Sequence, residues 1–134
     1  MPAVVLDTNI VVALLSSTDT LHGVARVAVE EREADGATFE LSAVSWAELL
    51  TGALRRGPAA VDALEAFVSA SIDDVVPVDM AVAAQAAALR AKDLTLRMPD
   101  ALVLATGHRP GVDAVLTGDK RLAKHASDLV EVIG

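Results

Sequence analysis

The stretch Ala3-Val4-Val5-Leu6-Asp7-Thr8-Asn9 joins an uninterrupted apolar run to an acidic residue. The apolar part, Ala3–Leu6, lacks the alternation of polar and apolar residues, as is typical of a strand buried on both faces of a parallel sheet. Asp7 follows this strand directly, where an unpaired carboxylate would be expensive to bury. In such sheets, ligands bind in the crevice at the carboxyl ends of the strands. The stretch therefore predicts a parallel sheet with Asp7 at its ligand-binding edge.

Four further runs along the chain have the same strand-like composition: Thr38–Leu41, Val75–Val78, Asp113–Thr117 and Leu129–Ile133. Helical patterns separate them, over Ile10–Leu15, Leu21–Glu33, Val44–Leu54, Ala59–Ser71, Met80–Lys92, Asp100–His108 and Lys120–His125. Because strands that alternate with helices form right-handed crossovers, we expect an α/β fold. Its predicted form is a three-layer sandwich with a central, mainly parallel five-stranded sheet. The length of 134 residues fits a single domain over residues 1–134.

Composition excludes several classes of protein. The chain has no cysteine, so a disulfide framework, a zinc–thiolate site and a cysteine nucleophile are ruled out. No apolar stretch of about 18 residues is present, and the N-terminal residues lack a signal-peptide pattern. We therefore expect a soluble, cytoplasmic protein. The net charge of −8 argues against a simple electrostatic nucleic-acid binder. It does not exclude an enzyme that acts on nucleic acid through bound cations.

Three further acidic residues are predicted to reach the same edge of the sheet as Asp7. Glu48 lies in the first turns of the helix after the second strand. Asp100 opens the helix before the fourth strand, and Asp119 follows that strand. The four carboxylates then share one crevice.

Each of these acids also has a structural explanation. Asp7 and Asp119 are candidate N-caps. Glu48 stands three residues after Ser45, which is the spacing of a capping box. Asp100 in a first helical turn complements the helix dipole. Taken one at a time, the structural and functional explanations are about equally good.

The four acids together favour a functional site. Carboxylates that converge on one crevice repel one another unless a cation neutralises them. Oxygen ligands without Cys or a paired His motif suit a hard ion such as Mg²⁺ or Mn²⁺. Such an ion holds a phosphate oxygen and lowers the pKa of bound water. Asp79, after the third strand, is equally well placed, but we interpret it as an N-cap only.

The acidic segments, taken in order, resemble the PIN-domain family, and specifically the VapC-type toxins of bacterial toxin–antitoxin pairs. They are Val5-Leu6-Asp7-Thr8-Asn9, Ala47-Glu48-Leu49, Pro99-Asp100-Ala101-Leu102-Val103-Leu104-Ala105-Thr106 and Leu116-Thr117-Gly118-Asp119-Lys120-Arg121-Leu122. The ordered set is specific, although no single segment is, and it covers nearly the whole chain. The resemblance implies a Mg²⁺- or Mn²⁺-dependent ribonuclease, a VapB-type antitoxin that blocks its site, and a homodimer.

The resemblance also assigns roles to individual residues. It makes Asp7, Glu48, Asp100 and Asp119 the acidic quartet that binds metal and carries catalysis. A second group, Thr8, Asn9 and Thr117, matches polar positions that orient this quartet. Gly118 departs from the Asn that many members carry before the last Asp, and we expect it to change the local turn and leave the ligands intact.

Other residues give weaker signals. Three cations flank the acids and are candidate contacts to RNA phosphates: Arg97, Lys120 and Arg121. The three histidines, His22, His108 and His125, fit no metal-ligand spacing, and surface or helix-end roles are expected. An apolar groove lined by Val11, Leu14, Leu15 and the helix around Leu49–Leu54 is a predicted dock for an amphipathic antitoxin helix.

Three other functions compete with a nuclease. A receiver-like signalling module needs an acidic pair after the first strand and a Lys after the fifth, whereas this chain has Asp7 alone and no such Lys. A phosphotransferase of the haloacid dehalogenase type needs Asp-x-Asp, and Asn9 replaces its second acid. A PIN fold that binds without cleaving is the third, and the intact quartet disfavours it.

Overall fold

The computed structural model describes residues 2–134, so Met1, the first residue of the predicted domain, lies outside the described part. Five strands form one sheet in the order β3-β2-β1-β4-β5, and every pair of neighbours is parallel. The strands are β1 (Ala3–Leu6), β2 (Thr38–Ser42), β3 (Asp74–Val76), β4 (Val112–Thr117) and β5 (Val130–Val132). The predicted α/β class and the five-stranded sheet are confirmed.

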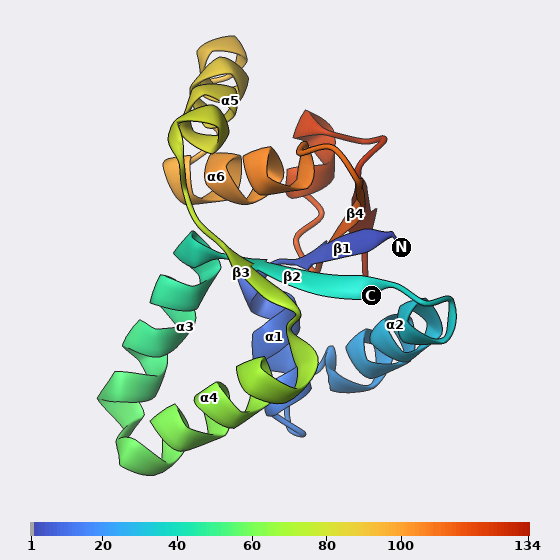
Figure 1. Ribbon diagram of the computed structural model, residues 1–134, viewed down its shortest axis with the longest axis vertical. Helices are drawn as coiled ribbons and strands as arrows, with labels where there is room; N and C mark the ends of the chain where they lie inside the picture. The colour runs from blue at the N-terminus through green and yellow to red at the C-terminus, as the bar shows by residue number, and fades with distance from the viewer. Residues whose placement is uncertain (1) are drawn as a thin grey trace.

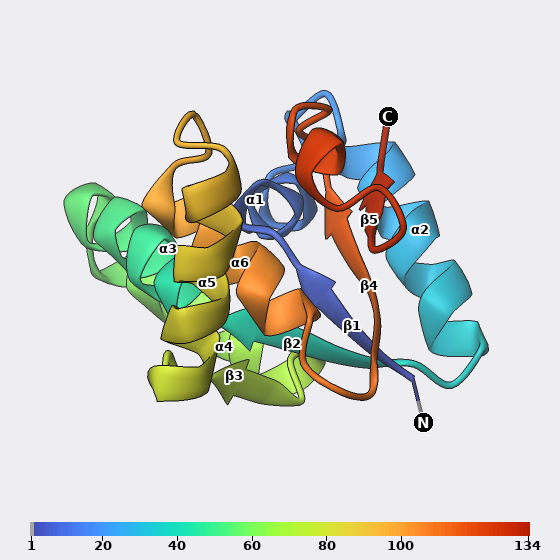
Figure 2. The ribbon, with the colours of Figure 1, turned by 90° about the horizontal axis from the view of Figure 1, so that it is seen from above.

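Helices cover both faces of this sheet (Figures 1 and 2). One face carries α1 (Thr8–Leu15), α2 (His22–Ala34), α3 (Ala43–Arg56) and α4 (Pro58–Ser71). The other carries α5 (Met80–Lys92), α6 (Met98–Gly107) and the short 3₁₀ helix η1 (Leu122–His125). Among residues 2–134, no helix is both long and apolar enough to cross a bilayer.

The central strand β1 contributes to two separate apolar cores. Val4 and Leu6 belong to the core under α1–α4, whereas Val5 belongs to the core under α5 and α6. Successive side chains of a strand point to opposite faces, so an uninterrupted apolar run fills both cores at once. This burial explains why the run has no polar residue until Asp7.

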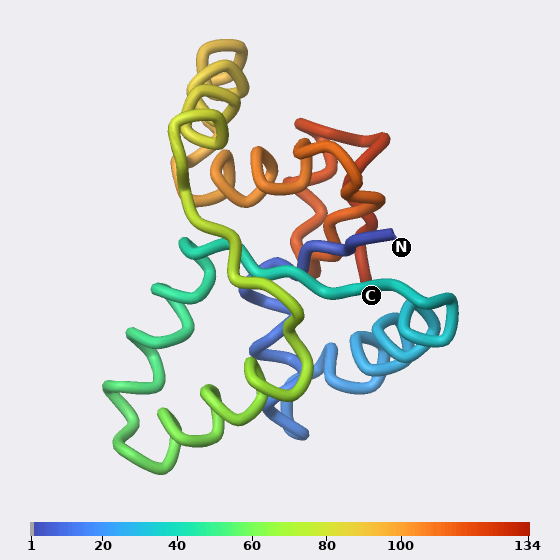
Figure 3. The backbone as a smooth tube through the Cα atoms, in the orientation of Figure 1, coloured from blue at the N-terminus to red at the C-terminus, as the bar shows by residue number. Residues whose placement is uncertain are grey.

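The order of the strands locates the crevice in which a ligand site is expected. The chain moves outward from β1 to β2 and β3, and then returns to the other side of β1 to add β4 and β5 (Figure 3). The direction therefore reverses between β1 and β4, which is where α/β proteins bind ligands. This order also differs from the order 2-1-3-4-5 of receiver domains, so a receiver-like module is excluded.

Some boundaries differ from those predicted. The third strand was expected over Val75–Val78, but β3 is Asp74–Val76. Pro77 has no N–H to donate to a neighbouring strand, which explains the early end. At the other end, Asp74 pairs in register with Glu40 of β2. The absence of an N–H on Pro77 would have predicted the end of β3 at Val76 from the sequence.

Candidate active site

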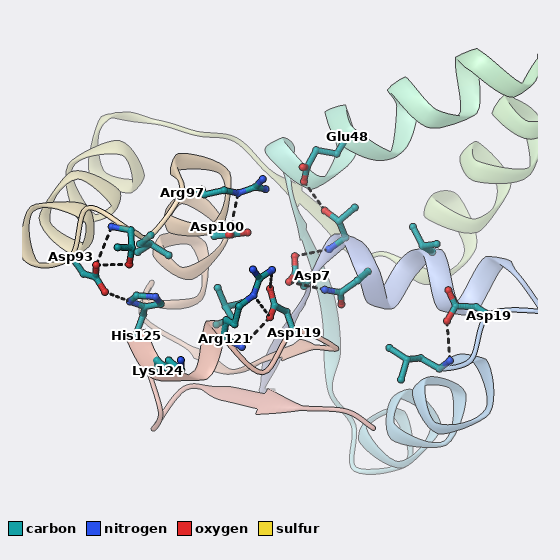
Figure 4. Close-up of a pocket in the computed structure, with 17 residues that line it drawn as sticks. Asp7, Asp19, Glu48, Asp93, Arg97, Asp100, Asp119, Arg121, Lys124 and His125 are labelled. Atoms are coloured by element: carbon teal, nitrogen blue, oxygen red, sulfur yellow. Dashed lines mark hydrogen bonds and ion pairs between the residues drawn. The ribbon is translucent and has the colours of Figure 1, made fainter.

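A pocket of about 820 Å³ opens at the predicted edge of the sheet, and all four predicted carboxylates line it (Figure 4). Asp7 follows β1, Glu48 comes from α3, Asp100 lies in the first turn of α6, and Asp119 follows β4. The structure therefore brings together acids that are up to 112 positions apart in the chain.

Asp7 is the most firmly held of the four. It is only 7% exposed, and its backbone N–H donates to the carbonyl of Leu116 over 2.9 Å, which continues the pairing of β1 with β4. Its Oδ1 accepts from the backbone N–H of Thr8 at 2.8 Å, and its Oδ2 accepts from the Thr117 hydroxyl at 2.8 Å. Burial raises the pKa of Asp7, and repulsion from Asp100 and Glu48 adds to this rise.

Hydrogen bonds link the predicted supporting residues into one network around Asp7. The Thr117 hydroxyl accepts from the Asn9 side-chain amide at 3.3 Å and from the Asp119 backbone N–H at 3.0 Å. The Asn9 amide also donates to Asp7 Oδ2 over 3.3 Å. Thr8 reaches the other wall of the pocket, where its hydroxyl donates to Glu48 Oε1 over 2.8 Å. Because Thr117 and Asp7 are buried, the centre of this network is fixed within the core, whereas the Thr8–Glu48 bond lies at the surface.

Asp100 and Asp119 are held differently, by exposed arginines. Arg97 Nε lies 3.6 Å from Asp100 Oδ2, and the Arg97 side chain is 72% exposed. Arg121 contacts both carboxylate oxygens of Asp119, at 3.1 Å from Nε and 3.2 Å from Nη2. This contact lowers the pKa of Asp119 below its ordinary value. These two acids therefore face cations that solvent can reach.

The structure tests the structural explanations for the acids. Asp119 is not an N-cap, because the N-cap of η1 is Arg121. Asp7 does cap α1 through its bond from Thr8, in addition to its place in the network. The capping box is wrong, because Ser42 is the N-cap of α3 and Ser45 lies buried within the helix. Asp79 is an N-cap as predicted, since its Oδ1 accepts from the backbone N–H of Val82 at 2.9 Å.

Two of the three predicted RNA-contact residues line the pocket, namely Arg97 and Arg121. Lys120 is exposed and is not among the residues that line it. The pocket also contains four ionisable residues that sequence reasoning did not select: Asp19, Asp93, Lys124 and His125. Asp19 comes from the α1–α2 loop, Asp93 from the α5–α6 loop, and Lys124 and His125 from η1, and no sequence motif connects them.

The turn around Gly118 is shaped by packing. Its backbone N–H donates to Asn9 Oδ1 over 2.8 Å. A Cβ at this position would approach a Leu21 methyl carbon to 2.6 Å, so Leu21 occupies the space that a larger residue would need. At Gly118, where many members of the family that the sequence resembles carry Asn, a leucine therefore packs over the turn. The four carboxylates nevertheless line the pocket.

The donor chemistry of the pocket fits a hard cation. Its carboxylate oxygens, with no thiolate present, are the ligands that Mg²⁺ and Mn²⁺ prefer. Within residues 2–134, no three His, Asp or Glu side chains lie close enough to hold an ion in the arrangement observed. In this arrangement, Arg97 contacts Asp100 and Arg121 contacts Asp119.

The fold and the pocket together define a class of protein, namely parallel α/β proteins with an acidic pocket between β1 and β4, where the strand order reverses. The family model of the PIN domain matches residues 4–128. This chain belongs to the PIN domain family.

Solved structures with the same fold come from toxin–antitoxin systems. VapBC2 from Rickettsia felis, solved bound to a promoter DNA fragment, matches at 16% identity with a TM-score of 0.82, over 98% of this chain and 99% of that chain. VapC20 from Mycobacterium tuberculosis, a sarcin–ricin loop cleaving toxin, matches at 24% identity with a TM-score of 0.73, over 98% and 99%. A toxin–antitoxin complex from Klebsiella pneumoniae matches at 23% identity with a TM-score of 0.75, over 96% of each chain. No curated protein matches this chain by sequence.

Proposed function

We propose that this chain is a Mg²⁺- or Mn²⁺-dependent endoribonuclease and the toxin of a VapBC-type toxin–antitoxin pair. The observation that carries the proposal is the convergence of Asp7, Glu48, Asp100 and Asp119 on one pocket. Membership of the PIN domain family and the similarity to VapC20, a sarcin–ricin loop cleaving toxin, support it. The same observation disfavours a PIN fold that binds without cleaving.

In this proposal, the acidic quartet holds the metal and its neighbours keep the quartet in place. A hard divalent ion bound there would supply positive charge to a phosphate oxygen and acidify a water for attack on phosphorus. Thr117 and Asn9 fix the orientation of the Asp7 carboxylate, and Thr8 fixes that of Glu48. Arg97 and Arg121 reach the same pocket and, once free of the carboxylates, can bind phosphates of the RNA.

An antitoxin partner follows from the same proposal. The solved VapBC complexes with this fold support a VapB-type antitoxin as the partner. In the proposal, this antitoxin blocks the pocket and the toxin is a homodimer. The groove predicted for an antitoxin helix needs one correction, because Val11 and Leu49 are buried in the core and cannot line it. The exposed apolar side chains in this region are Val12, Leu15 and Leu54.

Incubation of the purified protein with end-labelled RNA tests the catalytic proposal. We expect cleavage with Mg²⁺ or Mn²⁺ and none with EDTA. Cleavage that persists in EDTA would contradict a metal-dependent mechanism. A small open reading frame that overlaps the gene on its upstream side would support the antitoxin partner.

A further inference from the structure

The pocket has two different ends, one on each side of the acidic quartet. At one end lie Asp93, Lys124 and His125, and at the opposite end lies Asp19, with Asp7, Asp100 and Asp119 between them (Figure 4). Leu21, which also lines the pocket, lies at the Asp19 end, because its backbone N–H donates to Asp19 Oδ1 over 2.8 Å. An RNA strand carries one negative charge per nucleotide, so the end that holds Lys124 favours its phosphates, whereas Asp19 at the other end opposes them.

At the end that holds Lys124, the partly buried imidazole of His125 faces Asp93. Its Nδ1 lies 3.6 Å from Asp93 Oδ2, and the side chain is only 18% exposed. Asp93 is itself fixed, because its Oδ1 accepts from the backbone N–H of Thr95 at 3.0 Å and from the Thr95 hydroxyl at 2.6 Å. In the protonated ring both nitrogens are donors, so Nε2–H can donate to an anionic ligand while Nδ1–H faces Asp93.

The α5–α6 loop, which carries Asp93, is also fixed near the start of α6. Arg90 Nε donates to the carbonyl of Leu96 over 2.8 Å, which ties the end of α5 to the end of the loop. Leu96 is 3% exposed and packs in the core beneath α6. A wall fixed in this way does not need to be ordered when a ligand binds.

Lys124 stands beside His125 and is available to a ligand. None of the ion pairs within residues 2–134 involves Lys124, whereas Arg97 and Arg121 in the same pocket are both paired with carboxylates. Lys124 therefore has no ion pair to break before it can contact an anion.

We propose that Lys124 and His125 form a subsite for an RNA phosphate, next to the carboxylates and on the side of the α5–α6 loop. The subsite binds the backbone of the strand as it leaves the acidic quartet, and so sets the direction in which RNA crosses the pocket, away from Asp19. This inference rests on the proposed function, because it takes RNA as the substrate of the same pocket.

Binding of a fluorescein-labelled single-stranded RNA of mixed sequence, followed by fluorescence anisotropy in EDTA, tests the subsite without cleavage. We expect K124A to raise the Kd about threefold to tenfold and to reduce the slope of log Kd against log salt by about 0.7. The variant H125Q should also raise the Kd. In cleavage with Mg²⁺, both variants should raise KM and leave kcat nearly unchanged, because a neighbouring phosphate is bound equally in the ground and transition states.

Two matched controls separate the subsite from general charge. K92A removes a lysine that is exposed and lies next to Asp93 but outside the pocket, and H108Q replaces an exposed histidine outside the pocket. Both should bind RNA as the wild type does. The subsite is overturned if K124A keeps the wild-type Kd and salt slope, or if K92A weakens binding equally. Lys124 is exposed, so K124A should fold, and the assay remains decisive even if H125Q does not.

The outcomes also distinguish the subsite from the nuclease. A wild-type protein that binds RNA through Lys124 but never cleaves it would refute the proposed function and leave the subsite standing. Metal-dependent cleavage by the wild type, together with equal RNA affinities of K124A and K92A, would refute the subsite and leave the proposed function standing.

Discussion

The two sides of the acidic pocket are built in opposite ways. On one side, Asp7 is buried and receives hydrogen bonds from Thr117, Asn9 and the Thr8 backbone, all within 3.3 Å. On the other, Asp119 is paired with Arg121, whose side chain is 84% exposed. The pKa values diverge accordingly, because burial raises that of Asp7 and the guanidinium lowers that of Asp119.

The hydrogen bonds of Asp7 are fixed when the chain folds, whereas a ligand can replace the arginine ion pairs of Asp100 and Asp119. The Asp7 network cannot relax without disturbing β1 and β4, so its geometry is ready before any ligand arrives. The arginine pairs are solvated and therefore weak, and a divalent ion can replace them. We interpret the Asp7 side as the permanent part of the site and the Asp119 side as its exchangeable part.

Loss of a carboxylate from either side should produce the largest effect. We expect D7N and D100N to lower RNA cleavage by more than about 100-fold, beyond the 10–100-fold typical for residues that only support a metal ligand. Addition of Mg²⁺ should raise the Tm of the wild type, as any ligand specific to the folded state does, and raise it less in both variants. Cleavage rates and thermal melts with and without Mg²⁺ measure both effects.

The control for this comparison is D79N. Asp79 caps α5 and lies outside the pocket, and an asparagine is an equally good N-cap. Its cleavage rate and its response to Mg²⁺ should both match the wild type. Near-wild-type cleavage by D7N or D100N would remove the acidic quartet from catalysis, and simple unfolding of these variants would mean that the carboxylates are structural.

A substitution of Thr117 should weaken the permanent part of the site without removing a ligand. T117V deletes a buried hydroxyl that donates to Asp7 and accepts from Asn9 and the Asp119 backbone. We expect Mg²⁺ affinity to fall about 10–100-fold and the free energy of unfolding to fall by about 1–3 kcal/mol. Isothermal titration with Mg²⁺ and chemical denaturation measure these changes.

T106V is the matched control for T117V. Thr106 is also fully buried, but its hydroxyl donates only to the Leu102 carbonyl of its own helix. It should cost stability and leave Mg²⁺ affinity unchanged. An equal loss of Mg²⁺ affinity in the two variants would mean that the Asp7 network is not specific to the metal site.

The same division of the pocket explains what could be predicted from the sequence. The Asp7 side follows from local rules, because an apolar strand that ends in Asp-Thr-Asn must place those polar groups at the edge of the sheet. Asp100 and Asp119 follow from the same rule applied to α6 and β4. The order of the strands in the sheet was not needed for this prediction, since all strands of a parallel sheet end at the same edge.

The end of the pocket with Asp93, Lys124 and His125 could not be predicted in this way. Asp93 and His125 are 32 positions apart, and neither lies in a motif. Their contact depends on how the α5–α6 loop packs beside η1, which no periodicity in the sequence encodes. The capping box at Ser45 failed for a related reason, because Ser42 competes for the same role and the sequence does not rank the two.

The pH dependence of stability distinguishes the buried carboxylate from the exposed ones. Because the pKa of Asp7 in the folded state lies above its ordinary value of 3.8, its ionised form destabilises the fold at neutral pH. Below pH 3.8, the carboxyl is protonated in both states and this penalty vanishes. D7N should therefore hold or exceed wild-type stability at pH 7, with the difference shrinking as pH falls through the folded-state pKa. Urea denaturation across pH measures it, and a difference that grows on acidification would contradict the buried, repelled carboxylate.

The smallest effect, and the sharpest test of the exchangeable side, is expected from Arg121. If the guanidinium occupies oxygens that the metal needs, R121Q should raise Mg²⁺ affinity, by up to about fivefold given the weakness of exposed ion pairs. The same variant should weaken RNA binding when metal is present, because the freed arginine is then lost as a phosphate contact. These two changes have opposite signs, which no general loss of structure would produce. R55Q, at an exposed arginine of α3 outside the pocket, should change neither affinity. Weaker Mg²⁺ binding by R121Q would show that the arginine supports the metal site, and the division into permanent and exchangeable sides would then be wrong.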